Sequence, residues 1–314
     1  MKKFIIKSIL FLIPVLLFTI FLENLIRSVP NDYSIKKEYL DKNSAKIEVL
    51  ILGSSHTYFG IDPKYITAKT FNSAYISQSV DYDFEILKKY KTRFKQLKYI
   101  VIPIDYFSLY SRLEEGTEKW RIKNYNVYYN VNSSGPFKLS NHFELLNGKV
   151  SDNIMRVNLH YKEHKNDNIT CNGSGWGTIY KSENSINLTE TGKAAAKRHT
   201  INIQDNIYYK ENIKTIKSII QLAEEINVKV IFITSPAYKT YTANLEPNQL
   251  KGTIGFMNKT SKDNRNVMYY NLLEDKSFID KDFYDADHLN EIGAKKLSLK
   301  INNIINYKTN KVLE

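Results

Sequence analysis

The first apolar run of the chain is long enough to cross a lipid bilayer. Residues 4–22 contain one charged side chain, Lys7, and their length is close to the ~20 residues that span a hydrocarbon core. Lys2 and Lys3 precede the run, which predicts a cytoplasmic N-terminus and an extracytoplasmic remainder. A cleaved signal peptide is the alternative, but residues 23–28 offer no small-x-small cleavage site. We therefore expect residues 1–27 to form a cytoplasmic tip and a single-pass cell-membrane anchor surrounded by lipid, followed by a polar stalk at 28–45.

Beyond the stalk, short apolar runs alternate with amphipathic segments. The runs that predict buried strands are 46–53, 70–72, 98–105, 228–234 and 267–271. Apolar positions at helical spacing predict helices over 82–97, 208–227, 249–259 and 290–307. This alternation predicts an α/β domain over 46–310, with a mostly parallel sheet flanked by helices.

A long segment, 109–205, interrupts this alternation. It is rich in Asn, Tyr and Ser, and we expect it to be a large insertion between the third and fourth strands. Open α/β sheets bind ligands at the carboxyl ends of their strands. Gly53, Asn72, Asp105 and Thr234 end the predicted strands, so we look for a site near them.

Composition narrows the possible partners. Hydrophobic residues make up 42% of the chain, which is enough for a sizeable core. The net charge of +12 fits a lysine-rich bias or an attraction to an anionic surface such as lipid headgroups or an acidic polysaccharide. The lysines are scattered and no nucleic-acid-binding motif accompanies them, so we expect no nucleic-acid partner. Cys171 is the single cysteine, which excludes an intrachain disulfide and a Cys-based zinc cluster.

A tight turn follows the run at 46–53, with the sequence Gly53-Ser54-Ser55-His56. Such a turn can project the Ser55 hydroxyl at the sheet edge. The N-terminus of a following helix would then offer backbone N–H groups to a developing oxyanion. An ordinary turn with an N-capping serine explains the same residues. We expect His56 to face away from the site and to serve in packing or substrate contact.

A second polar turn, Asp285-Ala286-Asp287-His288, directly precedes the last predicted helix. A carboxylate three residues before the histidine can orient its imidazole, which can then take a proton from a serine. Asp285 is the expected orienter and Asp287 the alternative. The alternative without a catalytic role is a capped helix start with a solvated acidic loop.

Together the two turns resemble the motifs of the SGNH, or GDSL-like, hydrolases. In that family a Gly-Asp-Ser motif after the first strand carries the nucleophile, and an Asp-x-x-His motif before the last helix supplies the other two residues. Gly53-Ser54-Ser55 resembles the first motif, with Ser54 in place of Asp, and Asp285 and His288 match the second. The resemblance covers residues 46–105 and 208–307. It implies a flavodoxin-like sheet and a catalytic set of Ser55, His288 and Asp285.

The resemblance also implies an oxyanion hole, in which the family uses a Gly backbone N–H from a second block and an Asn side chain from a third. Ser77 takes the Gly position here, and its backbone N–H can still donate. The Asn has no clear counterpart. Asp105 lies near that point and would repel an oxyanion if ionised, while Gln78 or Asn72 could substitute. Removing one such donor costs on the order of 10²–10³ in rate, so we expect an activity that is low or dependent on a partner.

The other histidines give weaker indications of a catalytic or metal-binding role. We expect His199, at the end of the insertion, to line the cleft, and His142, His160 and His164 to lie on the surface. His160 and His164 have helical spacing but lack the Glu that follows the first His in a zinc-protease motif. We therefore expect neither a metal nor a cofactor.

The Gly-Ser-Ser variant and the membrane anchor together resemble the extracytoplasmic bacterial branches of the family, namely the teichoic acid D-alanyl transfer proteins and the alginate-type polysaccharide O-acetylation proteins. Such proteins work beside a multi-spanning membrane O-acyltransferase. The resemblance implies an esterase or O-acyl(acetyl)transferase that acts on a cell-surface polysaccharide or an acyl-carrier substrate. The rival is a catalytically weak or inactive polysaccharide-binding or scaffold subunit, which the incomplete oxyanion set motivates.

Overall fold

The computed structural model describes residues 1–131, 137–147, 149–204 and 206–310. Contacts divide the chain into two compact units. Unit 1 combines residues 1–37 with 120–169, and unit 2 combines residues 38–119 with those from 170 onward. Much of the segment expected as an insertion, 109–205, therefore groups with the N-terminal helix.

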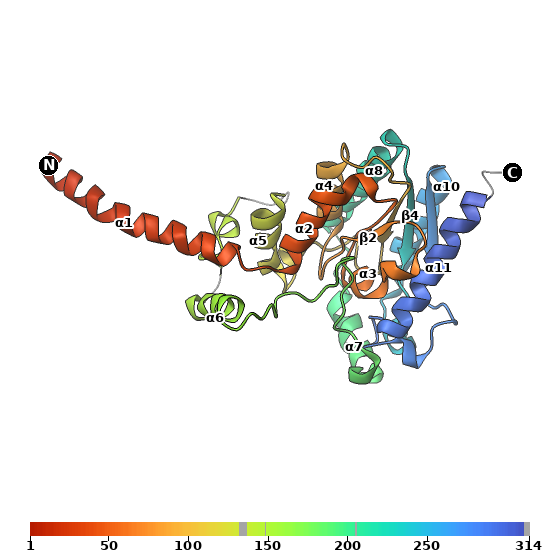
Figure 1. The fold of residues 1–314 in the computed structure, drawn as a ribbon. Helices are drawn as coiled ribbons and strands as arrows, with labels where there is room; N and C mark the ends of the chain where they lie inside the picture. The colour runs from red at the N-terminus through yellow and green to blue at the C-terminus, as the bar shows by residue number, and fades with distance from the viewer. Residues whose placement is uncertain (132–136, 148, 205, 311–314) are drawn as a thin grey trace. The chain divides into compact units, whose positions relative to one another are not determined.

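Unit 1 is helical, and α1 is its longest element (Figure 1). Its helices are α1 (Lys2–Arg27), α5 (Ile122–Asn124), which continues as a π-helical turn (Tyr125–Tyr129), and α6 (Val150–Tyr161). α1 has a mean hydropathy of 2.6 over its most apolar 18-residue window, none of which is buried. It is long and apolar enough to cross a membrane, a property that signal sequences share. The polar segment 28–45 contains α2 (Asp32–Asn43), which runs from unit 1 into unit 2.

Unit 2 is built on a five-stranded parallel sheet with the order β2-β1-β3-β4-β5. The strands are β1 (Val49–Ile51), β2 (Thr70–Asn72), β3 (Tyr99–Pro103), β4 (Lys229–Thr234) and β5 (Val267–Asn271). This is the flavodoxin-like order, in which the chain reverses its direction of strand addition between β1 and β3. The expected fold class is confirmed.

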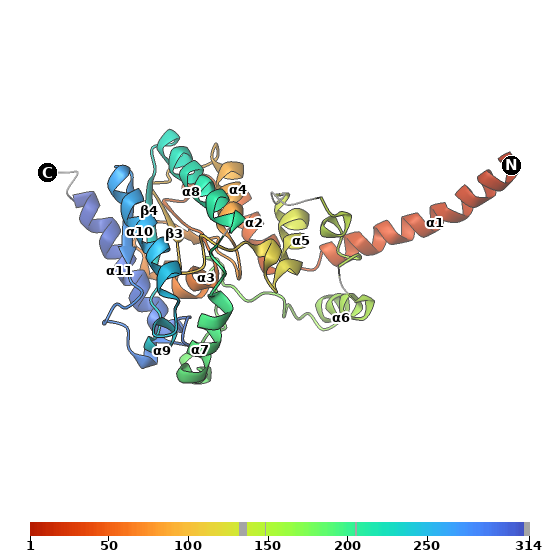
Figure 2. The same ribbon diagram turned by 180° about the vertical axis from the view of Figure 1, so that it is seen from behind.

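Helices flank the sheet of unit 2. They are α3 (Ser55–Gly60), α4 (Val80–Tyr90), α7 (Leu188–His199), α8 (Ile207–Glu225), α9 (Lys239–Thr242), α10 (Pro247–Asp263) and α11 (Glu291–Asn310). α4 lies beside α8, and α3 lies beside α11 (Figures 1 and 2).

The period of two along each strand explains how the sheet is covered. Val49, Val101 and Ile231 share one buried cluster with Leu297 and Ile301 of α11. The neighbouring positions along the strands point to the opposite face, because successive side chains alternate. Both faces are therefore covered, which is why the strands read as nearly continuous apolar runs.

Element boundaries differ from the expectation at one helix in particular. The helix expected over 82–97 ends at Tyr90, where the Tyr90 carbonyl accepts hydrogen bonds from the N–H groups of Arg93 (2.8 Å) and Phe94 (3.2 Å). The chain turns there, and Phe94 and Leu97 are buried on the way into β3. The apolar spacing beyond residue 90 thus reflects a buried connection.

Candidate active site

Ser55 stands at the first turn of α3, directly after β1. The chain can turn there because Gly53 adopts a φ of +106°, and a Cβ at this position would lie 2.1 Å from the Pro103 ring. Ser54 caps the helix, since its hydroxyl oxygen accepts from the His56 N–H at 3.4 Å. The capping role thus falls to Ser54, and the partly exposed Ser55 remains available for another contact.

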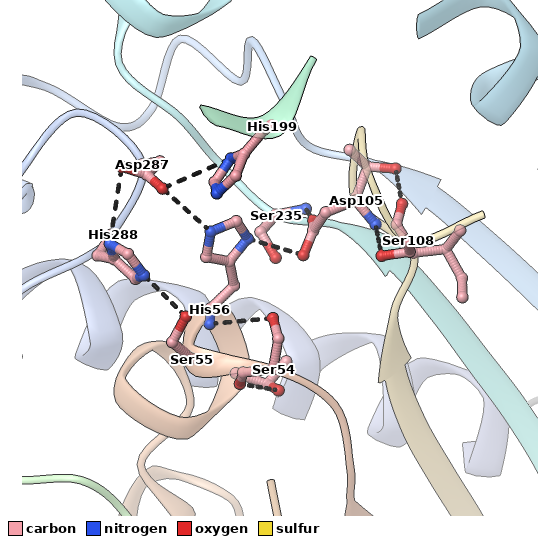
Figure 3. Close-up of polar contacts among 12 residues, drawn as sticks. Ser54, Ser55, His56, Asp105, Ser108, His199, Ser235, Asp287 and His288 are labelled. Carbon is pink, nitrogen blue, oxygen red and sulfur yellow. Dashed lines mark hydrogen bonds and ion pairs between the residues drawn. The ribbon is translucent and has the colours of Figure 1, made fainter. Parts of the chain in front are cut away.

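The structure brings Ser55, His288 and Asp285 together. Ser55 Oγ lies 2.8 Å from His288 Nε2 (Figure 3), and His288 Nδ1 lies 2.9 Å from Asp285 Oδ1. A carboxylate only accepts, so Nδ1 carries a proton, and Nε2 of the neutral ring accepts from the Ser55 hydroxyl. This is the arrangement a serine needs to lose its proton to a base.

The turn before α11 fixes Asp285 in place. Its Oδ1 also accepts from the backbone N–H groups of His288 (2.8 Å) and Asp287 (3.1 Å). The Tyr284 N–H donates to the His288 carbonyl at 2.9 Å, which closes the turn. Both residues of the Asp-x-x-His motif are thus oriented by their own local backbone, which is why their spacing was informative in the sequence.

His56 does not face away from the site, so the expectation for its orientation is wrong. His56 Nδ1 lies 2.7 Å from Asp105 Oδ2, and the His56 ring centroid lies 4.9 Å from that of His288. On its other side, His56 Nε2 lies 3.6 Å from Asp287 Oδ2 (Figure 3). The ring is turned this way because β1 and β3 are neighbours, which sets the first turn of α3 beside Asp105, two residues after β3.

The two carboxylates make His56 a cation. Burial lowers the pKa of His56, but Asp105 and Asp287 outweigh burial and raise it to about 10. Burial alone would raise the pKa of Asp105, but the His56 cation holds it below its usual value. The repulsive Asp105 expected from the sequence is therefore one half of a buried ion pair.

Asp287 links this ion pair to His288. It is buried, its Oδ1 lies 3.7 Å from His288 Nδ1, and its Oδ2 lies 3.6 Å from the Arg198 guanidinium. Burial raises the pKa of Asp287, but the neighbouring His288 and His56 lower it below its usual value. Since Asp285 is 0.8 Å closer to His288 Nδ1 (3.7 against 2.9 Å), its geometry suits the orienting role better than that of Asp287.

His199 lies beside the same group of side chains and is half-buried. Its Nδ1 lies 2.9 Å from the Tyr241 hydroxyl and 3.9 Å from Asp287 Oδ2. Burial lowers the pKa of His199 to about 3, so the ring is neutral at neutral pH. His199 is thus a half-buried neighbour of the His56 and Asp287 pair, and the expectation that it lines the cleft stays a prediction.

The expected oxyanion donors divide into two groups. The amide of Asn72 donates to the carbonyls of Thr57 and Ile61, both at 2.9 Å, and the amide of Gln78 donates to Asp83 at 2.6 Å. Both side-chain amides are therefore already occupied by hydrogen bonds within the fold. By contrast, the backbone N–H groups of Ser55 and Ser77 have no hydrogen-bond acceptor among the described residues. Ser77 has a φ of +58°, a conformation that favours glycine.

An aromatic stack beside His288 was not anticipated. Tyr180 lies between Phe59 and Tyr284, with both ring-centroid distances at 3.8 Å, and its ring meets His288 edge-on at 5.4 Å. Burial, together with the nearby Asp285 carboxylate, raises the pKa of Tyr180 above its usual value. A nearby glycine was the sequence feature that could have indicated this packing. Gly177 packs so closely on α3 that a Cβ would lie 2.7 Å from Phe59.

Among the residues that the structure describes, one group of side chains offers metal ligands. His56, Asp287 and His288 have ligand atoms within 4.8 Å of one another. Asp105 behind His56 resembles the carboxylate that often orients a metal-binding histidine. An ion here would have to displace a proton of the His56 cation and compete for His288. Within the described part of the chain, Asp287 Oδ2 has no hydrogen-bond partner, but the His56 cation and Arg198, each at 3.6 Å, balance its charge without an ion.

No protein-family model matches the chain, and no curated protein matches it significantly. Among solved structures, the chain is similar to a proposed acylhydrolase from Bacteroides fragilis, with 11% identity, a TM-score of 0.41, and coverage of 88% of this chain and 96% of that chain. It is also similar to a protein from Streptococcus pneumonia described as a proposed platelet activating factor, with 9% identity, a TM-score of 0.41, and coverage of 94% and 97%. Similarity at this level does not identify an activity.

Proposed function

We propose that the chain is a membrane-anchored serine acyl-ester hydrolase or O-acyltransferase that acts on a cell-surface polysaccharide. The observation that carries the chemistry is the pair of contacts made by one imidazole, to Ser55 Oγ at 2.8 Å and to Asp285 Oδ1 at 2.9 Å. The surface setting follows from the resemblance to SGNH proteins and from an apolar N-terminal helix of sufficient length.

In the proposed reaction, His288 Nε2 takes the Ser55 proton while Ser55 Oγ bonds to the acyl carbon of an ester. The protonated imidazole then gives its proton to the departing alcohol, which leaves an acyl-serine. In the second half, an acceptor hydroxyl attacks the acyl-serine, and Ser55 recovers its proton through His288. The acceptor is water in a hydrolase and a sugar hydroxyl in a transferase.

The charges around His288 favour this proton transfer. Asp105, His56 and Asp287 together carry one net negative charge, and Asp285 adds a second. Both stabilise the imidazolium that forms as Ser55 attacks. The backbone N–H groups of Ser55 and Ser77 are the proposed oxyanion donors, with no third side-chain donor assigned.

The proposed setting is the outer face of a bacterial cell membrane, with α1 as the anchor. An acyl group for transfer would come from an acyl carrier or from a multi-spanning membrane O-acyltransferase beside the chain. The rival proposal is a scaffold or polysaccharide-binding subunit without turnover, and the two-donor oxyanion site is the observation that favours it.

An aryl acetate offered with an oligosaccharide acceptor tests the proposal. We expect the full-length protein in detergent to release the aryl alcohol and the Ser55→Ala variant to release none above background. Mass spectrometry of the oligosaccharide separates the two enzyme classes, because an acetylated sugar indicates transfer and free acetate alone indicates hydrolysis. Equal release by both proteins would contradict the enzymatic proposal and leave the scaffold.

A further inference from the structure

Unit 1 has a second apolar surface besides α1. Six large apolar side chains within residues 137–155 are each at least 57% exposed: Phe137, Leu139, Leu146, Val150, Ile154 and Met155. We call this set the apolar surface of unit 1. A soluble protein rarely exposes so many large apolar groups in one short segment unless something covers them.

The interior behind this surface is polar and charged. Glu144 is buried, and its carboxylate accepts from Lys123 at 2.7 Å, Tyr128 at 2.7 Å and Arg156 at 3.1 Å. Burial raises the pKa of Glu144, but the Lys123 cation outweighs burial and holds it below its usual value. The segment thus buries the Glu144 carboxylate with its cationic partners and exposes six large apolar side chains.

α6 also exposes large apolar side chains, beside the exposed polar Ser151 and Asp152. Asn153 is 4% exposed, whereas Val150 and Ile154 are 66% and 63% exposed. Arg156 also points inward, to Glu144. A helix at a water-facing surface turns its apolar stripe inward. An apolar stripe that faces outward is expected where the surroundings are hydrocarbon.

The apolar surface is attached to the end of α1. Glu23 accepts from the backbone N–H groups of Glu144 at 2.9 Å and Leu145 at 3.0 Å, and Arg27 donates to the His142 carbonyl at 2.7 Å. α6 contacts α1 and lies beside its C-terminal part (Figure 1). Glu23 directly follows the apolar run 4–22, so these bonds tie the segment to the level where α1 would leave the bilayer.

We propose that the apolar surface of unit 1 lies in the lipid–water interface of the outer leaflet, as a second membrane contact beside α1. Apolar side chains enter the boundary between headgroups and acyl chains, as in interfacial amphipathic helices. Lys138, Lys149 and Lys162 are exposed in or near the same segment. Their positive charges complement the negative charges of lipid phosphates. The inference rests on the part of the proposed function that makes α1 the anchor.

Depth-dependent quenching in vesicles tests this contact. The full-length chain, with Cys171→Ser, receives one cysteine at Ile154, labelled with an environment-sensitive fluorophore, and is reconstituted into vesicles of phosphatidylcholine and phosphatidylglycerol with brominated acyl chains. Leu12→Cys in α1 reports whether the anchor is inserted, and Lys262→Cys on α10 is a matched exposed position in unit 2. We expect the probe at 154 to shift its emission to the blue and to lose most of its fluorescence to the bromolipids, as the probe at 12 does.

The outcomes separate the two proposals. Quenching at 12 with a water-exposed probe at 154 overturns the interfacial contact, leaves the anchor intact and points to a protein partner for the surface. The absence of quenching at both positions contradicts the anchor and, with it, this inference. The Val150→Ser substitution, made in the protein labelled at position 12, is the control for folding. Its fluorescence should match that of the protein without the substitution, because only the exposed side of α6 has changed.

Discussion

The central feature at the scale of residues is the surroundings of one imidazole. His288 contacts Ser55 and Asp285 directly, and a charged series of Asp105, His56 and Asp287 lies beside it. The second carboxylate, Asp287, is fully buried and held by cations. Its proximity raises the question of which carboxylate orients His288.

Replacing each carboxylate by its amide answers that question. We expect Asp285→Asn to lower ester hydrolysis by on the order of 10⁴, because an amide nitrogen facing Nδ1 favours the wrong tautomer of the base. Asp287→Asn should lower it far less, since its closest approach to Nδ1 is 3.7 Å. Steady-state rates of the two variants, with unfolding curves to exclude misfolding, provide the comparison. A larger loss in Asp287→Asn would reverse the assignment.

His56 is expected to stabilise the fold as a cation. In His56→Gln, Asp105 loses its partner, and breaking a buried ion pair costs about 3–5 kcal/mol. The double variant His56→Gln/Asp105→Asn should recover part of this loss, because it removes the stranded carboxylate and keeps an acceptor for the Ser235 N–H. Denaturant titrations measure the free energies of unfolding, with the exposed His164→Gln as a control. Strictly additive losses would show that the two side chains do not interact.

Chelation tests the group of possible metal ligands. We expect dialysis against EDTA to leave ester hydrolysis unchanged, because ion pairs with Asp105, Asp287 and Arg198 balance the charges of this group and His288 is bonded to Asp285. Elemental analysis of the purified protein and rates before and after dialysis provide the readout. An activity that is lost on dialysis and restored by a divalent ion would assign these residues to a metal instead.

The residues fall into two classes of predictability. Ser55, Asp285 and His288 stand in short local motifs, so the sequence predicted a place for each. The His56 and Asp105 pair joins residues 49 positions apart and exists because β1 and β3 are neighbours in the sheet. No local pattern carries that information, and the expectation that His56 faces away was wrong for this reason. The catalytic roles themselves stay a prediction.

At the scale of elements, the turn between β1 and α3 depends on α4. Asp83 of α4 is buried and accepts from the Gly53 N–H at 2.8 Å and from the Gln78 amide at 2.6 Å. The hydrogen bond from the Gly53 N–H to Asp83 stabilises the turn that presents Ser55. Burial raises the pKa of Asp83 from 3.8 to about 7, even though these hydrogen bonds lower it.

The raised pKa of Asp83 predicts how stability depends on pH. Between about pH 4 and pH 7 the folded state binds more protons at Asp83 than the unfolded state, so the free energy of unfolding falls as pH rises through this window. Asp83→Asn should remove this dependence and raise stability at pH 8 by about 1–3 kcal/mol, because the neutral amide still offers an oxygen to Gly53. Thermal unfolding from pH 5 to 8 measures the effect, with exposed Asp263→Asn as the matched control. A variant that is less stable than the parent at pH 8 would contradict this account.

The elements could be predicted where periodicity was strong. The five apolar runs became strands, and the stripe of Ile216, Ile219 and Ile220 lies on the buried face of α8. The apolar spacing that includes Phe94 predicted a helix beyond residue 90 where there is none. A buried connection and a helix can bury the same residue types, so the pattern did not distinguish them. Tyr180 was missed since it lies in an irregular segment without a periodic pattern.

At the scale of the whole molecule, the alternation of strand and helix was sufficient to predict the α/β fold. The grouping of residues 120–169 with the N-terminal helix could not be predicted, because it depends on bonds such as that from the Glu144 N–H to Glu23, 121 residues away. The expected cofactor-free, polysaccharide-directed chemistry and its membrane partner remain proposals that rest on Ser55 being a nucleophile.

Covalent labelling of Ser55 is the most direct measurement of that claim. The full-length protein in detergent is treated with a fluorophosphonate, digested and analysed by mass spectrometry, beside Ser55→Ala and Ser54→Ala. The account predicts an adduct on Ser55 in the parent and in Ser54→Ala, and none in Ser55→Ala, because only the Ser55 hydroxyl is bonded to His288 Nε2. An unlabelled parent, or equal labelling of the parent and Ser55→Ala, would contradict it.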